Sequence, residues 1–326
     1  MKKIKRFLSV LLVCCLFSAL LPSAALAADT VASGTCGDNL TWVLDSTGTL
    51  TISGTGDMAN YSAAQSYYST GTAPWHDYDT ERTFIKSVEI GSGVTSIGDY
   101  AFCGCEGLTS VIIPDGVTSI GQSSFSSCTA LTEIDLPDSI ASIGISAFAS
   151  CYLLAYINIP GSVESIGQST FSYCENLTNV TIGSGVTAIS NYMFDNCQSL
   201  TSISIPSSVT SIGEFAFRRC AMSNIDIPDS VTSIGNWAFA YCPNLIDITI
   251  PSQVANIGDD AFYMCDSLTN VTIQDGPTAI GYYAFYKCPN LQSITIPKSV
   301  AWIYGIAFEG CNSLTDVYYG GSSIDW

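Results

Sequence analysis

Ten cysteines and ten phenylalanines recur at a fixed interval and are the most regular chemical groups in the chain. The interval is 23 residues, with one of 22, and each cysteine follows a phenylalanine by three positions. Thiols can form disulfides or bind zinc, but thiols on parallel Cβ vectors fit disulfide geometry poorly, and the sequence has no Cys-x-x-Cys pair. We therefore expect a core ladder of buried thiols that act as small apolar groups. The ladder comprises Phe102, Phe125, Phe148, Phe171, Phe194, Phe217, Phe239, Phe262, Phe285 and Phe308 with Cys105, Cys128, Cys151, Cys174, Cys197, Cys220, Cys242, Cys265, Cys288 and Cys311.

Four further cysteines lie outside this series. Cys14 and Cys15 fall in an apolar N-terminal segment, whereas Cys36 precedes the repeats and Cys103 is separated from Cys105 by one residue. Disulfides form in exported proteins. A Cys36–Cys103 bridge is thus the one disulfide candidate, and two further thiols are the alternative.

Acid–base and metal chemistry have few candidates. His76 is the only histidine, and it lies beside Asp77 in a segment without repeats. It could act as a base or a ligand, but a loop histidine bonded to its neighbours is the simpler interpretation. The adjacent Asp259 and Asp260 and four scattered aspartates could bind calcium, whereas aspartate after a strand is a common turn former. The scattered ones are Asp115, Asp138, Asp229 and Asp275. No phosphate loop or nucleophile elbow is present, so we predict no catalytic residue, no metal, no cofactor and no enzyme.

A set of aromatic residues is the remaining candidate site. Tyr192, Phe215 and Trp237 occupy the same position in successive repeats, two residues after the turn glycine or its replacement. Two interpretations stay open: the rings pack over the turns, or they form a binding ridge, since aromatic anchors dominate protein interfaces. The candidate ridge comprises Tyr192, Phe215, Trp237, Tyr241, Tyr263, Tyr283 and Tyr286.

The repeated unit that positions these residues is predicted to be one coil of a solenoid. Residues 131–137 alternate apolar and polar side chains, which is typical of a strand with one buried face, and Pro137 ends it. Gly144 is expected to take a positive φ and lead into a short helical or 3₁₀ piece that carries Phe148. Residues 140–143 form a second short extended piece. A single unit buries too little apolar surface to fold alone, so the units must stack.

The repeat resembles the BspA-like class of leucine-rich repeats. The string Ile-Pro-x-Ser-Val-Thr-Ser-Ile-Gly-x-x-Ala-Phe-x-x-Cys at 227–242 carries the resemblance, which covers residues 86–319. It implies a β-rich, right-handed leucine-rich-repeat coil of about ten units with a parallel sheet of eleven strand segments. The sequence departs from ordinary leucine-rich repeats because Ser139 and its equivalents replace the asparagine or cysteine expected after the strand. Proteins of this class are typically exported bacterial surface or secreted proteins that adhere to host matrix proteins and other cells.

Residues 1–27 are predicted to be a secretory signal peptide of bacterial type. A basic head precedes an apolar run over 7–21, and Ala25-Leu26-Ala27 matches a small-x-small cleavage site. A membrane helix is the alternative, but a span needs about 20 residues. We expect cleavage near Ala27, secretion or surface display, and no membrane span.

Residues 28–85 are predicted to cap the solenoid of residues 86–326. Segments 40–44 and 49–53 alternate around a turn at 45–48 and predict a β-hairpin. An aromatic loop with Tyr61, Tyr67, Tyr68, Trp75 and Tyr78 follows. At the other end, either Trp326 covers the last coil or the chain is a fragment of a longer protein.

The charge balance narrows the choice of partners. The chain has 10 Lys and Arg against 28 Asp and Glu, and loss of the leader's four basic residues lowers the net charge from −18 to −22. Nucleic acid is excluded, because phosphates are held by clustered cations. The sequence therefore predicts an exported, monomeric, non-catalytic adhesion module that binds proteins of the host matrix or of other cell surfaces. The alternative is a carbohydrate- or peptidoglycan-binding module of the cell envelope.

Overall fold

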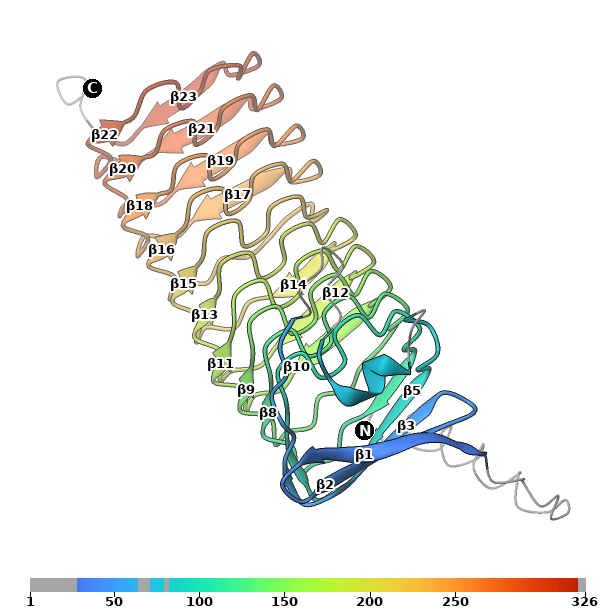
Figure 1. Cartoon of the computed structure of the whole chain (residues 1–326). Coiled ribbons are helices and arrows are strands. Elements are labelled where there is room, and N and C mark those ends of the chain that lie inside the picture. The colour runs from blue at the N-terminus through green and yellow to red at the C-terminus, as the bar shows by residue number, and fades with distance from the viewer. Residues whose placement is uncertain (1–27, 64–70, 79–81, 322–326) are drawn as a thin grey trace, which may run out of the picture.

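The computed structural model describes residues 28–63, 71–78 and 82–321. The predicted signal peptide, Tyr67, Tyr68 and Trp326 lie outside these residues. The described chain winds into a long solenoid whose coils stack one behind another (Figure 1). Almost every long-range backbone pairing joins residues of adjacent coils, so the predicted repeat solenoid is confirmed.

Two lines of parallel strands run along the solenoid. The first line consists of β5 (Ser87–Ile90), β7 (Ser110–Ile112), β10 (Tyr156–Ile159), β12 (Asn179–Ile182), β14 (Ser202–Ser204), β17 (Asp247–Ile250), β19 (Asn270–Ile273), β21 (Ser293–Ile296) and β23 (Asp316–Tyr319). The second consists of β4 (Gly56–Asp57), β6 (Val94–Ile97), β8 (Ser119–Ile120), β9 (Ser142–Ile143), β11 (Ser165–Ile166), β13 (Ala188–Ile189), β15 (Ser211–Ile212), β16 (Ser233–Ile234), β18 (Asn256–Ile257), β20 (Ala279–Ile280) and β22 (Trp302–Ile303). The short extended piece predicted at 140–143 is a member of this second line.

The first line alternates buried and exposed side chains, as the sequence predicts. In β12, Val180 and Ile182 are buried and Asn179 and Thr181 are exposed. We call the exposed positions of this line the strand face. The line is interrupted at 131–137 and at 224–228, where no strand forms, so the strand predicted at 131–137 is wrong. The second interruption follows the coil that is one residue short, whereas nothing in the structure explains the first.

The segment around each phenylalanine is a run of hydrogen-bonded turns, so the predicted helical or 3₁₀ piece is wrong there. Ser126 N–H donates to the carbonyl of Ser123 (3.2 Å), and Cys128 N–H donates to that of Phe125 (3.2 Å). The intervening amides bond to the next coil instead, as Phe125 N–H does to Ala147 O (2.8 Å). A helix needs every amide for bonds within its own segment. Among the described residues, the one helix is the 3₁₀ helix η1 (Pro74–Asp77).

The turn glycines act through close approach, and the positive φ expected at Gly144 is wrong. The left-handed residues of that coil are Ser146 (φ 54°) and Ser150 (φ 60°). A Cβ on Gly144 would lie 2.5 Å from the backbone nitrogen of Gln122 in the preceding coil. The glycine is therefore required because adjacent backbones touch at this corner.

Stacked rings and thiols fill the interior. Successive phenylalanines of the ladder stack with centroids 5.2–5.7 Å apart, and Trp75 of η1 extends the stack onto Phe102 at 5.5 Å. Each thiol from Cys128 onward donates to the carbonyl of a phenylalanine 25 or 26 residues earlier, as Cys174 Sγ does to Phe148 O at 3.2 Å. Burial raises the pKa of the Cys174 thiol well above its usual value, so it stays neutral.

The other two cysteines of the described chain are buried as well. Burial raises the pKa of Cys36 and of Cys103 to about 11, and both are thiols in the structure. Cys36 ends a strand of the cap, and Cys103 lies in the first coil. The bridge between them stays a prediction.

The N-terminal hairpin is confirmed and is continuous with the solenoid. Strand β2 (Leu40–Asp45) pairs antiparallel with β3 (Thr49–Gly54), and β3 pairs in parallel with β5. An additional strand, β1 (Thr30–Gly37), covers the outer side of β2 with two register shifts. In Figure 1 this hairpin lies across the N-terminal end of the stack. Trp75 is fully buried behind it, so the end ring of the ladder is shielded from water.

Candidate functional site

Three positions in each coil form one side of the solenoid, which we call the turn face. They lie two residues before the ladder phenylalanine and one and two residues after it. Around Phe217 they are Phe215, Arg218 and Arg219. The first and third of these residues have left-handed backbone in nearly every coil, so their side chains project from the corners of the turns.

The seven residues of the predicted ridge all lie on the turn face and are brought together. Tyr192 stacks on Phe215 at 4.6 Å between centroids, and Phe215 stacks on Trp237 at 5.8 Å. The ring contacts continue from Trp237 to Tyr263 at 5.1 Å. The remaining contacts are Tyr241–Tyr263 at 5.3 Å, Tyr263–Tyr286 at 5.2 Å and Tyr283–Tyr286 at 5.3 Å. The rings thus form one continuous aromatic strip across five coils, and each ring is half-buried.

The aromatic strip occupies backbone positions that do not favour large side chains. Tyr192, Phe215, Trp237 and Tyr283 have φ between 54° and 59°. The left-handed region costs a non-glycine residue about 1–2 kcal/mol, and bulky residues are rare there. Serine fills the same position in three earlier coils, at Ser123, Ser146 and Ser169. The turn itself therefore forms without a ring, so the rings are candidates for a role at the surface.

Three cations accompany the strip, and the sequence analysis missed them. The guanidinium of Arg218 lies 4.8 Å from the ring centroid of Phe215, and that of Arg219 lies 5.5 Å from Tyr241. The ammonium of Lys287 lies 5.2 Å from the ring of Tyr286. Only six basic residues follow the predicted leader, so half of them lie on the strip. The sequence could have indicated them, because each follows a ladder phenylalanine by one or two residues.

The two adjacent arginines differ in their partners. Arg218 donates from Nε and Nη2 to the carboxylate of Asp195 at 2.8 and 2.9 Å, and Asp195 is buried. These bonds raise the pKa of Arg218 and fix its side chain. Arg219 donates from Nη1 to Oδ1 of Asn196 at 3.2 Å. Within the described chain, Arg219 forms no ion pair with a carboxylate.

A carboxyl group interrupts the column of left-handed rings, although the strip continues past it through Tyr263. Asp260 takes the position between Trp237 and Tyr283 in the column of left-handed residues. Burial, reinforced by the charge of Asp259, raises the pKa of Asp260 to about 6. The charge at the centre of the strip therefore changes in mildly acidic solution.

The other candidates of the sequence analysis do not converge on a site. His76 lies in η1, where burial lowers its pKa to about 4, and its Nε2 is buried without a hydrogen-bond partner among the described residues. Asp115, Asp138 and Asp229 lie in the turns that follow the first strand line. In the part of the chain that the structure describes, no three His, Cys, Asp or Glu side chains could hold a metal ion together. No helix there has the length and apolar character of a membrane span.

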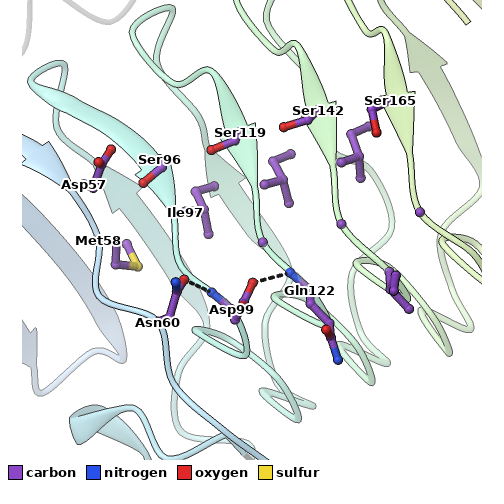
Figure 2. A pocket seen from close by; sticks show the side chains of 16 residues that line it. Asp57, Met58, Asn60, Ser96, Ile97, Asp99, Ser119, Gln122, Ser142 and Ser165 are labelled. Carbon is purple, nitrogen blue, oxygen red and sulfur yellow. Dashed lines mark hydrogen bonds between the residues drawn. The ribbon is translucent and has the colours of Figure 1, made fainter.

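A hollow lies along the second strand line. It has a volume of about 550 Å³ and is lined by a row of serines, one from each of β6, β8, β9 and β11 (Figure 2). At its base, Asp99 N–H donates to Oδ1 of Asn60 at 2.9 Å, and Gln122 N–H donates to Oδ1 of Asp99 at 2.6 Å. These polar groups join one coil to the next, so we assign them a structural role.

Comparison with known proteins agrees with this architecture. Residues 78–201 and 187–315 match the family described as BspA type leucine rich repeat region, in six copies. A leucine-rich repeat protein from Bacteroides ovatus has a similar structure, with 28% identity and a TM-score of 0.60 over 86% of this chain and 80% of that chain. One from Eubacterium ventriosum has 24% identity and a TM-score of 0.55 over 88% and 85%. A protein from Faecalibacterium prausnitzii, named a leucine rich cell surface protein, has 28% identity and a TM-score of 0.43 over 92% and 98%.

No curated protein matches the sequence. The family match nevertheless spans most of the chain and coincides with the coils of the solenoid. Repeat proteins of this kind are in general non-catalytic binding modules, typically of the cell surface. The chain belongs to the BspA-type leucine-rich repeat family.

Proposed function

We propose that this protein is an exported, non-catalytic binding module that recognises proteins through the aromatic strip. The strip itself carries the proposal: its seven rings are in continuous contact, and five of them lie at left-handed backbone positions, several of which hold serine in other coils. Aromatic side chains and arginine are the residues that dominate protein interfaces. The N-terminal leader and the cell-surface character of the family support export.

The stacking of the rings favours a protein partner over a sugar. Carbohydrates bind aromatic side chains through the ring faces, which must be open. The faces of Phe215 are covered, because Tyr192 and Trp237 lie nearly parallel to it in the two adjacent coils and Arg218 lies over it. At Phe215 the strip therefore presents a ring edge, which suits apolar side chains, other aromatic rings and carbonyl groups of a protein.

Carbohydrate or peptidoglycan binding remains the second candidate, and a different surface favours it. The strand face is a regular array of hydroxyl and amide groups, such as Asn179 and Thr181 on β12 and Asn270 and Thr272 on β19. Such groups match the hydrogen-bonding pattern of sugar hydroxyls. A glycan that binds this protein is therefore expected to depend on the strand face, and not on the aromatic strip.

A double variant tests the role of the strip. Phe215→Ser with Trp237→Ala removes its central rings and leaves the turn intact, because small residues occupy the same position in other coils. We expect binding to at least one protein from a panel of purified matrix glycoproteins, and a loss of at least about tenfold in affinity in the variant. Circular dichroism and the melting temperature should stay close to those of the unmodified protein.

The matched control is placed on the strand face. Ile112→Ser with Tyr156→Ser removes two exposed apolar side chains there, 59% and 43% accessible, and should leave the affinity unchanged. Loss of binding in this control, with none in the strip variant, would contradict the proposal. Capture by a glycan array alone would favour the second candidate, and turnover of any substrate in a hydrolase panel would show that the module is an enzyme.

A further inference from the structure

A hollow beside the aromatic strip is lined in part by polar side chains. It has a volume of about 380 Å³ and is lined by Gln198, Arg219, Cys220, Tyr241 and Pro243. This volume is large enough for a single side chain or a single sugar ring. Arg219 and Gln198 are exposed to solvent, whereas Cys220 is fully buried.

The groups around the hollow are donors of hydrogen bonds. The guanidinium of Arg219 has five N–H donors, of which the structure assigns Nη1 to Oδ1 of Asn196. The side-chain nitrogen Nδ2 of Asn196 is buried, and within the described chain it has no acceptor. Asn196 itself is 1% exposed, so this donor is shielded from solvent. Buried donors of this kind are rare and call for an explanation.

Charge at the hollow is positive, although the protein as a whole is strongly acidic. Asp195, the nearest buried carboxylate, is held by Arg218 through two hydrogen bonds. Burial raises the pKa of Cys220 well above its usual value, so the floor of the hollow carries no thiolate. Arg219 is therefore the one charge that faces the hollow from its lining.

We propose that this hollow binds the carboxylate of an aspartate or glutamate side chain of the partner protein, through the guanidinium of Arg219. The inference rests on the proposed function, because it names the group that the partner would present next to the strip. A guanidinium fits a carboxylate in a planar, bidentate arrangement. Contact with Tyr241 at 5.5 Å restrains the guanidinium and leaves its edge available.

A glutamate derivative with a free side-chain carboxylate tests binding to Arg219 directly. The chain has four arginines, Arg6, Arg82, Arg218 and Arg219, so their Nε–Hε signals can be assigned in a ¹⁵N-labelled protein by substitution. Titration with N-acetyl-glutamate N-methylamide should shift the Arg219 signal saturably, with a dissociation constant on the order of 1–10 mM. The neutral N-acetyl-glutamine N-methylamide should bind at least about tenfold more weakly, because the charge-assisted bonds are lost.

Two variants and a second ligand make the test decisive. Arg219→Gln should abolish the saturable shifts of neighbouring amides, whereas Lys287→Gln, which removes another cation of the strip, should leave them unchanged. No saturable shift up to about 50 mM glutamate derivative would overturn the proposal. Saturation by glucuronate and not by the glutamate derivative would overturn the protein source of the carboxylate.

The outcome is separable from that of the proposed function. If the strip variant loses protein binding while Arg219 does not respond to the glutamate derivative, the strip remains the binding surface and the hollow is not a carboxylate site. If the unmodified protein binds no protein of the panel, the proposed function fails whatever the titration shows.

Discussion

Glycine and left-handed residues have separate tasks at the corners of each coil. Left-handed backbone falls on non-glycine residues such as Ser146, whereas Gly144 has an ordinary φ. The glycine is needed because the preceding coil lies against its Cα. The spacing of turn glycines such as Gly144 thus reflects contact between coils. Within the repeats, positive φ falls on glycine at Gly104 and Gly310, at corners of the first and last coils.

This separation predicts different behaviour for two glycines of successive coils. Gly144→Ala should lower the free energy of unfolding by about 2 kcal/mol or more, because its Cβ would lie 2.5 Å from a backbone atom and both backbones would have to shift. Gly161→Ala should be nearly neutral, since the nearest atom, the hydroxyl oxygen of Ser184, lies 3.7 Å from the new Cβ. Urea unfolding measures both. Equal losses in the two variants would contradict the contact argument.

The residues of the candidate site were only partly predictable from the sequence. The aromatic strip was indicated because Tyr192, Phe215 and Trp237 share one position of the repeat. Arg218 and Arg219 were not indicated by the sequence. Periodicity identifies side chains that recur from repeat to repeat, and arginine occurs only once at each of these two positions of the repeat. Whether a ring presents its face or its edge depends on the distance between coils, which a sequence does not contain.

Elements that depend on contacts between coils were also the hardest to predict. The segment around each phenylalanine has spacing that suits a short helix, yet its alternate amides bond to the next coil. Strand β1 was missed because its sequence, TVASGTCG, has small residues and no apolar alternation, and it forms by pairing with β2. The hairpin and most strands of the two lines were predictable, because the local sequence sets their apolar positions, whereas the strand predicted at 131–137 does not form.

The cap is expected to weaken in mildly acidic solution. Burial lowers the pKa of His76 in η1 from 6.5 in an unfolded chain to about 4 in the folded chain. A hydrogen bond to the Ala101 backbone and the charge of Asp77 raise the pKa and partly offset the effect of burial, whereas the charge of Arg82 lowers it further. The unfolded state therefore binds the proton first, and stability is lost as the pH falls from about 6.5 to about 4. The loss attributable to His76 is on the order of 2 kcal/mol.

Comparison with a variant separates the contribution of His76 to the pH dependence of stability from the contributions of the many carboxylates. His76→Gln keeps a polar side chain that does not titrate in this range. The difference in unfolding free energy between the unmodified protein and the variant should shrink as the pH is lowered from 7 to 4. Hydrogen exchange should locate the change in the amides of residues 28–63 and 71–78. A difference that is constant with pH would contradict the shifted pKa.

At the scale of the whole molecule, the turn face is divided into two halves. Its early coils present small side chains, mainly serine, from Ser123 to Ser172, and its later coils present the aromatic strip with its cations. The ladder of phenylalanines and thiols is the same behind both halves. A uniform core with a variable surface is what a repeat architecture allows, because each coil contacts only its neighbours and its outward residues can change without repacking.

The same architecture predicts that a core defect costs more in the middle of the stack than at its end. Phe194 is fully buried between Phe171 and Phe217 at 5.7 and 5.6 Å, whereas Phe308 is partly exposed and stacks on Phe285, its one ring partner among the described residues. Phe194→Ala should lower the free energy of unfolding by about 3–5 kcal/mol, the cost of a large buried cavity. It should also divide unfolding into two transitions, because the coils on either side are coupled only through the damaged one. Phe308→Ala should cost about half as much or less, since it loses one ring contact and its site is open to water. Urea unfolding followed by far-UV circular dichroism and by tryptophan fluorescence distinguishes one transition from two. A single transition with equal losses in both variants would show that the solenoid unfolds as one cooperative body, and not coil by coil.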